Sequence, residues 1–341
     1  MELSRESSLL PWSASGLFGM ALILLLAASM SASSAKPFFQ RGVNFTAEGR
    51  DGYSDAVARP VLKQLAAFGV DAIALVPYAF TPRSAPVVRF GGGFETDEGI
   101  KQVALAAHAL GMKVLLKPQV WVRPGFPGDL EFTNPADRAK WFAGYRAYIE
   151  HQAGLATRIG ADLFCVGVEF VKLSADEKEW RQLIARVREI YRGPLTYAAT
   201  QGPEFEKLRF WDALDYIGLN NYYPLPDDLS TAALIAKVET VQRRFHKPVL
   251  LTETGFSSYE APHRQPWDET PRKVVQQDQA RCYEAILRGF YGKPWFYGMY
   301  WWKVGTDGHG GPEEGSFTPW RKPAMEVVKR WYLTVRPGSA R

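Results

Sequence analysis

The stretch GADLFCVGVE (residues 160–169) decides the fold, because it holds a helix end, a complete strand and the first residue after that strand. A segment of helical period, residues 135–159, comes before it, and Gly160 is the residue type that most readily ends a helix. Leu163–Val168 is a short apolar run without polar alternation, which is typical of a strand buried on both faces. A buried strand that follows a helix after a tight turn predicts a parallel sheet covered by helices.

The same unit recurs on both sides of this stretch. We expect strands at residues 42–45, 72–77, 113–117, 163–168, 195–198, 216–220, 249–252 and 297–302, and helices at 55–68, 96–110, 135–159, 175–191, 205–213, 231–245, 274–290 and 324–333. Eight such units predict a single closed (β/α)₈ TIM barrel of the α/β class. The alternative is an open, doubly wound sheet, which usually has fewer strands and often carries a glycine-rich phosphate turn after the first one. No such turn follows residues 42–45, so we expect one barrel domain over residues 36–341.

Residues 1–35 have the pattern of a secretory signal peptide. Arg5 precedes the apolar stretch Leu17–Ala28, and small residues follow up to Ala35. The alternative is an uncleaved membrane anchor, but the apolar stretch is shorter than the roughly 20 residues that cross a bilayer. We therefore predict export to the periplasm or the medium, cleavage after Ala35, and no stable membrane association of the mature chain.

Composition excludes several classes of function. Charged residues make up 23% of the 341, the net charge is +5, and the basic residues form no long run, so nucleic acid is not expected as a partner. The two cysteines, Cys165 and Cys282, are too few for a disulfide framework. The five histidines lack metal-ligand spacing, so we predict neither a metal nor a cofactor. Aromatic residues reach 13%, which is more than a core alone usually needs.

Two glutamates lie at the C-terminal ends of expected strands, which is where the catalytic residues of barrel enzymes are found. Glu169 ends the fourth expected strand and Glu253 ends the seventh. A carboxylate at the end of an apolar strand is costly unless it is used, paired or protonated. Either glutamate alone could be a structural acid bonded to an arginine or a backbone amide. Two glutamates that face each other are the catalytic residues of a typical glycosidase. One has a raised pKa and protonates the leaving oxygen, while the other stays ionised. Their separation decides the stereochemistry, with about 5–5.5 Å for retention and about 6.5–9.5 Å for inversion.

The other strand ends carry aromatic and polar side chains that suit a sugar, since flat rings cover the apolar faces of sugars and polar groups bind the hydroxyls. Adjacent strand residues point to opposite faces, so one of Trp301 and Trp302 faces the barrel axis, and we expect it to be Trp302. Packing in the core is the alternative for any single tryptophan. Tyr222 or Tyr223 could also hold Glu253 in its ionised form. The full set of expected sugar contacts is Asn44, Tyr78, Lys117, Gln119, Trp121, Tyr197, Asn220, Tyr222, Tyr223, Trp301 and Trp302.

These motifs resemble the clan of retaining glycoside hydrolases built on this barrel, and within it glycoside hydrolase family 113, whose characterised members are mainly β-1,4-mannanases. The similarity runs through GVNF (42–45), LLKP (115–118), FCVGVE (164–169), TETGF (252–256) and YWW (300–302). The resemblance implies that Glu169 is the general acid/base and Glu253 the nucleophile of a retaining reaction. Most of the clan has an asparagine immediately before the acid/base, whereas this chain has Val168. Another residue, such as Asn220, Lys117 or Gln119, must then bind the 2-hydroxyl of the sugar.

Together with the signal-peptide pattern and the histidine spacing, the resemblance leads us to expect an exported, monomeric, metal-independent hydrolase of polysaccharides or oligosaccharides, with endo-β-1,4-mannanase as the expected activity. One alternative keeps the enzyme class and changes the substrate to xylan or β-glucan. The other is a barrel that binds carbohydrate without cleaving it, which predicts ligand binding that does not depend on either glutamate.

Overall fold

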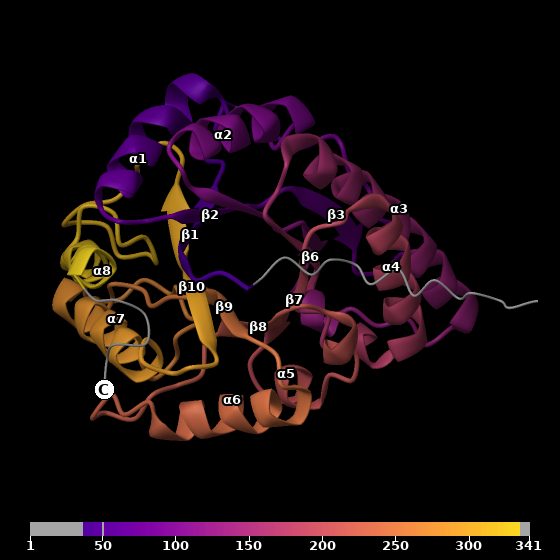
Figure 1. Ribbon diagram of the computed structural model, residues 1–341. Helices are drawn as coiled ribbons and strands as arrows, with labels where there is room; N and C mark the ends of the chain where they lie inside the picture. Colours follow the sequence, from indigo (N-terminus) through magenta and orange to yellow (C-terminus); the bar gives the residue numbers. More distant parts are fainter. Residues whose placement is uncertain (1–36, 50, 335–341) are drawn as a thin grey trace, which may run out of the picture. The chain divides into compact units, whose positions relative to one another are not determined.

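The computed structural model describes residues 37–49 and 51–334 (Figure 1). The expected signal peptide lies outside the described residues. Among those that are described, no helix combines the length and the apolar character needed to cross a membrane.

Eight parallel strands close into a barrel, which confirms the predicted fold class. Around the barrel the order is β1, β10, β9, β8, β7, β6, β4 and β2, and β2 pairs with β1 to complete the circle. The strands are β1 (Gln40–Thr46), β2 (Ala72–Leu75), β4 (Lys113–Leu116), β6 (Leu163–Val168), β7 (Leu195–Thr200), β8 (Ile217–Asn221), β9 (Val249–Thr254) and β10 (Phe296–Gly305). Each corresponds to one of the strands expected from the sequence.

Helices follow the strands and form the outer layer (Figure 1). They are α1 (Asp55–Ala67), α2 (Asp97–Ala109), α3 (Pro135–Ile159), α4 (Glu177–Ile190), α5 (Pro203–Lys207), α6 (Ala232–Phe245), α7 (Gln276–Phe290) and α8 (Pro323–Thr334). Local sequence sets the ends of α3: the Asn134 side chain accepts a hydrogen bond from the Ala136 amide, and Gly160 takes a left-handed conformation with φ 65°. This helix end delivers the chain into β6.

Two further strands were not expected. β3 (Tyr78–Pro82) and β5 (Gln119–Arg123) pair in parallel as a separate two-stranded sheet. They follow β2 and β4 directly, beyond Pro77 and Pro118, and the Gln119 amide bonds to the Pro77 carbonyl between the two sheets. The small sheet therefore carries two chain segments past the end of the barrel. Its residues alternate between buried and partly exposed, so one face packs inward and the other is open.

The hydrophobic core has two layers. The larger layer fills the space between the strands and the helices. The smaller layer fills the barrel interior with Ala72, Ala74, Leu115, Leu163, Cys165, Val168, Ala198, Tyr216, Leu250 and Tyr300. Each fully buried aliphatic side chain contributes about 1.5–3 kcal/mol to stability, so the filled interior makes the barrel a rigid support and not a pore.

Candidate active site

A cleft of about 1230 Å³ lies at the C-terminal ends of the barrel strands. Its lining includes residues that follow β1, β6 and β10 together with residues of β3 and β5. Pockets for single small ligands usually measure about 300–1,000 Å³, so this cleft has room for more than one sugar ring. Both carboxylates expected from the sequence lie at this end of the barrel.

Glu169 is half-buried in the cleft wall directly after β6. Burial raises the pKa of this carboxyl to about 7, and the nearby charge of Glu253 raises it further, while Asn220, Lys117 and Thr200 act in the opposite direction. A carboxyl group with such a pKa holds a proton at neutral pH for a large part of the time. Glu169 is therefore equipped to donate a proton and to take it back.

Glu253 lies near the end of β9 and is almost fully buried. Three side chains donate to its carboxylate: Lys117 Nζ to Oε1 at 2.5 Å, Gln119 Nε2 to Oε1 at 2.9 Å, and the Tyr222 hydroxyl to Oε2 at 2.9 Å. Hydrogen bonds and a cation directed at the ionised form stabilise that form. Glu253 is thus held as an anion beside a glutamate that is favoured as an acid. This unequal pair is the arrangement that glycoside hydrolysis requires.

The expected role of Lys117 as a sugar contact is corrected by this geometry. The Lys117 side chain is fully buried and its ammonium is committed to Glu253. Gln119 also bonds to Glu253, but it is partly exposed and lines the cleft. The position of both residues at the end of the barrel was predicted correctly. That their side chains donate hydrogen bonds to Glu253 could not be read from the sequence.

The two tryptophans of β10 separate as the alternation of a strand predicts. Trp302 lines the cleft, and Lys117 Nζ lies 5.0 Å from the centroid of its ring. Trp301 is fully buried and stacks on Tyr283 of α7, with the ring centroids 3.8 Å apart. Trp301 therefore packs between the barrel and the helices, and its expected contact with sugar is corrected.

Tyr78 and Trp121 lie in the cleft lining, as expected, because the unexpected sheet of β3 and β5 carries them there. Their ring centroids are 5.7 Å apart, and the Arg123 guanidinium lies 4.5 Å from the Trp121 ring. Trp121 is 54% exposed, which is unusual for a side chain of its size. A large, fixed and exposed ring of this kind suits the apolar face of a sugar.

Four other expected contacts do not line the cleft. The Tyr197 hydroxyl bonds to buried Glu204, and the Tyr223 hydroxyl bonds to Glu206 of α5, so both side chains belong to the helix side of the barrel. Asn44 is fully buried and donates to the Thr252 and Tyr300 carbonyls. Tyr222 is buried behind Glu253 and acts on that carboxylate, as the sequence analysis had allowed.

Asn220 is also fully buried, and it lies next to the catalytic pair. Its Oδ1 accepts a hydrogen bond from Thr252 Oγ1 at 2.9 Å, while its Nδ2 has no hydrogen-bond partner among the described residues. Asn220 is among the groups that favour the ionised form of Glu169. Its expected contact with the reacting sugar stays a prediction, and its position beside Glu169 is consistent with it.

Sequence reasoning missed part of the cleft lining. Phe90 and Phe94 flank the glycine run 91–93 in the loop after β3, and both are exposed at 39% and 53%. Glu95 and Glu269 also line the cleft. The available signal was the pair of aromatic residues on either side of three consecutive glycines.

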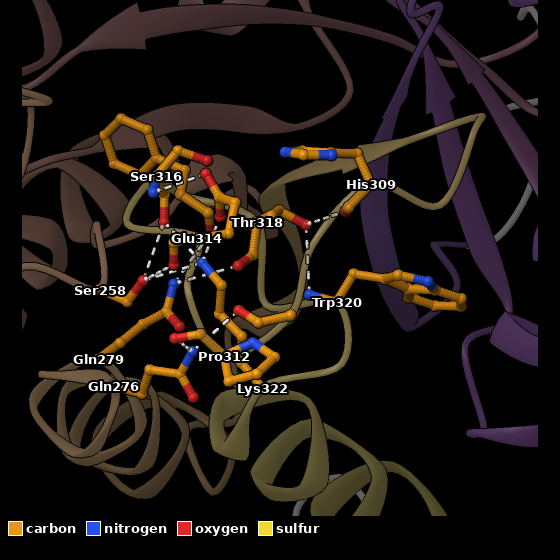
Figure 2. A network of polar contacts seen from close by, with 12 residues as sticks. Ser258, Gln276, Gln279, His309, Pro312, Glu314, Ser316, Thr318, Trp320 and Lys322 are labelled. Atoms are coloured by element: carbon orange, nitrogen blue, oxygen red, sulfur yellow. Dashed lines mark hydrogen bonds and ion pairs between the residues drawn. The ribbon is translucent and has the colours of Figure 1, made fainter. Parts of the chain in front are cut away.

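The loop between β10 and α8 forms another part of the wall and is anchored by a buried lysine (Figure 2). Lys322 Nζ donates to Glu314 Oε2 at 2.5 Å, to Ser258 Oγ at 2.8 Å and to the Ser316 carbonyl at 3.1 Å. In the same network, Gln279 of α7 donates to the Phe317 carbonyl at 3.1 Å. These bonds fix the segment that presents His309, Ser316 and Thr318 to the cleft.

Within residues 37–49 and 51–334, no group of three or more histidine, cysteine, aspartate or glutamate side chains is placed to hold a metal ion.

The chain matches the family model described as Glycoside Hydrolase Family 113 over residues 43–309. Among solved structures, it is similar to the GH113 β-mannanase AaManA from Alicyclobacillus acidocaldarius, solved in complex with ManMIm. The two are 32% identical, with 88% of this chain and 99% of that chain covered and a TM-score of 0.81. A complex structure of a GH113 β-1,4-mannanase is 26% identical over 87% of this chain and 99% of its own, with a TM-score of 0.80.

The β-glucuronidase of Faecalibacterium prausnitzii shares the fold at 15% identity and a TM-score of 0.63, with 89% of this chain and 50% of that chain covered. A comparison with curated proteins found no match. The family match spans most of the barrel and includes both Glu169 and Glu253. This chain belongs to glycoside hydrolase family 113.

Proposed function

We propose that this glycoside hydrolase is a retaining endo-β-1,4-mannanase. The single observation that carries the mechanism is the unequal pair at the C-terminal end of the barrel, with Glu169 favoured as an acid and Glu253 held as an anion by three donors. The substrate is supported by the similarity to GH113 β-mannanases, of which one is 32% identical over 88% of this chain. The size of the cleft and its exposed aromatic rings support binding along a polysaccharide.

In the first step, a Glu253 carboxylate oxygen attacks the anomeric carbon and the bond from that carbon to the glycosidic oxygen breaks. Glu169 gives its proton to the leaving oxygen, so the leaving sugar departs as an alcohol. In the second step, water attacks the anomeric carbon and the ester bond to Glu253 breaks. Glu169 takes the proton of the water, and the enzyme returns to its starting state with the anomeric configuration retained.

The substrate is tested by incubating the purified protein with mannan, glucomannan, xylan and a mixed-linkage β-glucan. We expect release of short mannooligosaccharides, with a rapid fall in the viscosity of glucomannan because internal bonds are cut. Faster hydrolysis of xylan or the β-glucan would overturn the substrate assignment and keep the enzyme class. Binding of mannan without any release of reducing ends would overturn the hydrolase.

We also propose export as the fate of the chain, supported by the apolar stretch Leu17–Ala28 and the small residues that follow it. Expression of the full chain in a bacterial host, followed by fractionation and N-terminal sequencing, tests this proposal. A mature chain that begins at Lys36 outside the cytoplasm would support it, and a full-length chain retained in the cytoplasm would contradict it.

A further inference from the structure

A third glutamate, Glu204, is buried near the catalytic pair, and the proposed mechanism does not use it. Glu204 belongs to α5, is almost fully buried, and is absent from the lining of the cleft. Its Oε1 accepts a hydrogen bond from the Tyr197 hydroxyl at 2.6 Å, and its Oε2 accepts one from the Thr200 amide at 2.7 Å. Burying a carboxyl group in this apolar layer is costly, and the two hydrogen bonds offset that cost. The presence of a glutamate at this position therefore requires an explanation.

Tyr197 connects this carboxyl group to the catalytic acid. Its hydroxyl oxygen accepts a hydrogen bond from the Phe170 amide at 3.0 Å, and Phe170 is the residue after Glu169. The next residue of β7, Ala198, accepts a hydrogen bond at its carbonyl from the Glu169 amide at 2.9 Å. Two consecutive residues of β7 thus hold the backbone on both sides of the Glu169 side chain.

Glu169 requires this support because of its backbone conformation. Its φ is +58°, in the left-handed region that side chains other than glycine rarely adopt. Such a conformation persists only where the surrounding structure holds it in place. A glycine would relieve the strain, but it would also remove the carboxyl group that the reaction needs.

We propose that Tyr197 and Glu204 are positioning residues that hold the strained backbone at Glu169 and thereby aim its carboxyl group at the leaving oxygen. The inference rests on the proposed role of Glu169 as the acid/base. The Phe170 amide uses the Tyr197 oxygen as its acceptor, so the hydroxyl hydrogen must point to another acceptor, which Glu204 supplies. Glu204 also fixes the Thr200 amide at the end of β7 and must therefore accept two hydrogen bonds. An amide side chain has only one oxygen and would lose one of these bonds in either orientation.

The test compares Tyr197→Phe and Glu204→Gln with the matched control Tyr191→Phe. The Tyr191 hydroxyl is also buried and bonds to a backbone atom, the Ala161 carbonyl at 2.7 Å, but it lies at the opposite end of β6. Each variant is assayed on a mannooligosaccharide, whose leaving group needs a proton, and on a mannoside with a strongly acidic phenol as the leaving group, which does not. Thermal unfolding of each variant is measured in parallel.

For Tyr197→Phe we expect kcat on the oligosaccharide to fall about 10- to 100-fold, because a small misplacement of a catalytic group is costly. We expect a much smaller loss in kcat/KM for the mannoside of the acidic phenol, because this quantity reports the first step, in which that leaving group needs no proton. The KM for the oligosaccharide should change little. Glu204→Gln should show the same selectivity to a lesser degree. Tyr191→Phe should lower the unfolding temperature by a comparable amount and slow the two substrates equally.

The inference would be overturned if Tyr197→Phe and Tyr191→Phe changed the ratio of the kcat/KM values for the two substrates equally. If Tyr197→Phe does not fold, Glu204→Gln decides by the same ratio, since it preserves the volume of the side chain. A wild-type protein that cleaves neither substrate would instead refute the proposed function, so the two failures can be told apart.

Discussion

The ends of β6 and β9 carry the same residue type, yet their surroundings give the two glutamates opposite character. Glu169 follows β6 in a left-handed conformation, with burial and a neighbouring anion raising its pKa. Glu253 is the next-to-last residue of β9 and accepts hydrogen bonds from a lysine, a glutamine and a tyrosine. The difference shows that the roles of acid and nucleophile are assigned by neighbours on other strands and not by the glutamates themselves.

The largest expected effect is the loss of Glu253. Glu253→Ala should lower kcat on mannan by on the order of 10⁴- to 10⁶-fold, because no other side chain can form the covalent intermediate. Steady-state kinetics on mannooligosaccharides provide the measurement. Added azide should not restore formation of the normal retained product in this variant.

Replacing Glu169 should have a smaller effect that depends on the leaving group. Glu169→Ala should slow mannooligosaccharide hydrolysis about 10²- to 10⁴-fold, the usual contribution of general acid–base catalysis. A mannoside with an acidic phenol should still be attacked by Glu253, and azide should then release a mannosyl azide of retained configuration. A mannosyl azide of retained configuration from Glu253→Ala, with one of inverted configuration from Glu169→Ala, would exchange the two roles.

Two lysines at the cleft test what holds the Glu253 anion. Lys117→Met removes a buried partner of Glu253 and should cost about 3–5 kcal/mol of unfolding free energy as well as activity, because it leaves a buried charge without its cation. Lys303→Met breaks a half-exposed ion pair with Glu48 and should cost about 0–1 kcal/mol. Urea denaturation of both variants measures the contrast, and equal losses would mean that the Lys117 pair is not special.

The pH dependence of stability tests the raised pKa of Glu169. The pKa of Glu169 is about 7 in the folded protein and lies above its ordinary value of 4.5. The unfolded chain therefore ionises first as pH rises, and wild-type stability should fall between about pH 4.5 and 7 through this group. Glu169→Gln removes this loss and should be more stable than wild type at pH 8 but not at pH 4.

Glu253→Gln is the matched control for that measurement. It leaves the buried Lys117 ammonium without its counter-ion and should be less stable than wild type at pH 8. Calorimetric unfolding temperatures at the two pH values separate the cases. A destabilised Glu169→Gln at pH 8 would show that its carboxyl group is not disfavoured in the ionised form.

The smallest expected effect on activity comes from the two neighbouring tryptophans of β10. Trp302→Ala should raise KM and lower kcat with little change in stability, because its ring lines the cleft. Trp301→Ala should lower stability by about 3–5 kcal/mol through the loss of packing against Tyr283. Activity and thermal unfolding measured on both variants would expose any exchange of these roles.

The barrel could be predicted because its signal is local. Each buried strand is a short apolar run and each helix has its own period, so the eight units are readable without knowledge of their contacts. The positions of Glu169 and Glu253 follow from the same pattern, since strand ends meet at one end of a parallel barrel. β3 and β5 were missed because Pro77 and Pro118 separate them from β2 and β4, and because each strand has only 5 residues.

The roles of individual cleft residues were harder to predict because they depend on contacts between distant segments. Lys117 and Gln119 have the expected position, but only the approach of β9 shows that Glu253 takes their donors. We expected Tyr197 and Tyr223 in the cleft because both lie close to strand ends in the sequence. In the structure, their hydroxyl groups donate to carboxylates of α5 and point away from the cleft. No local pattern in the sequence contains that information.

The most direct test of the account is to trap the covalent intermediate. The protein is incubated with a fluorinated mannosyl donor that carries a good leaving group, and the digested protein is then analysed by mass spectrometry. The account predicts one added fluoromannosyl group on the peptide that contains Glu253, with an unmodified Glu169. A label on Glu169, or turnover of the donor with inverted configuration and no label on either glutamate, would contradict it.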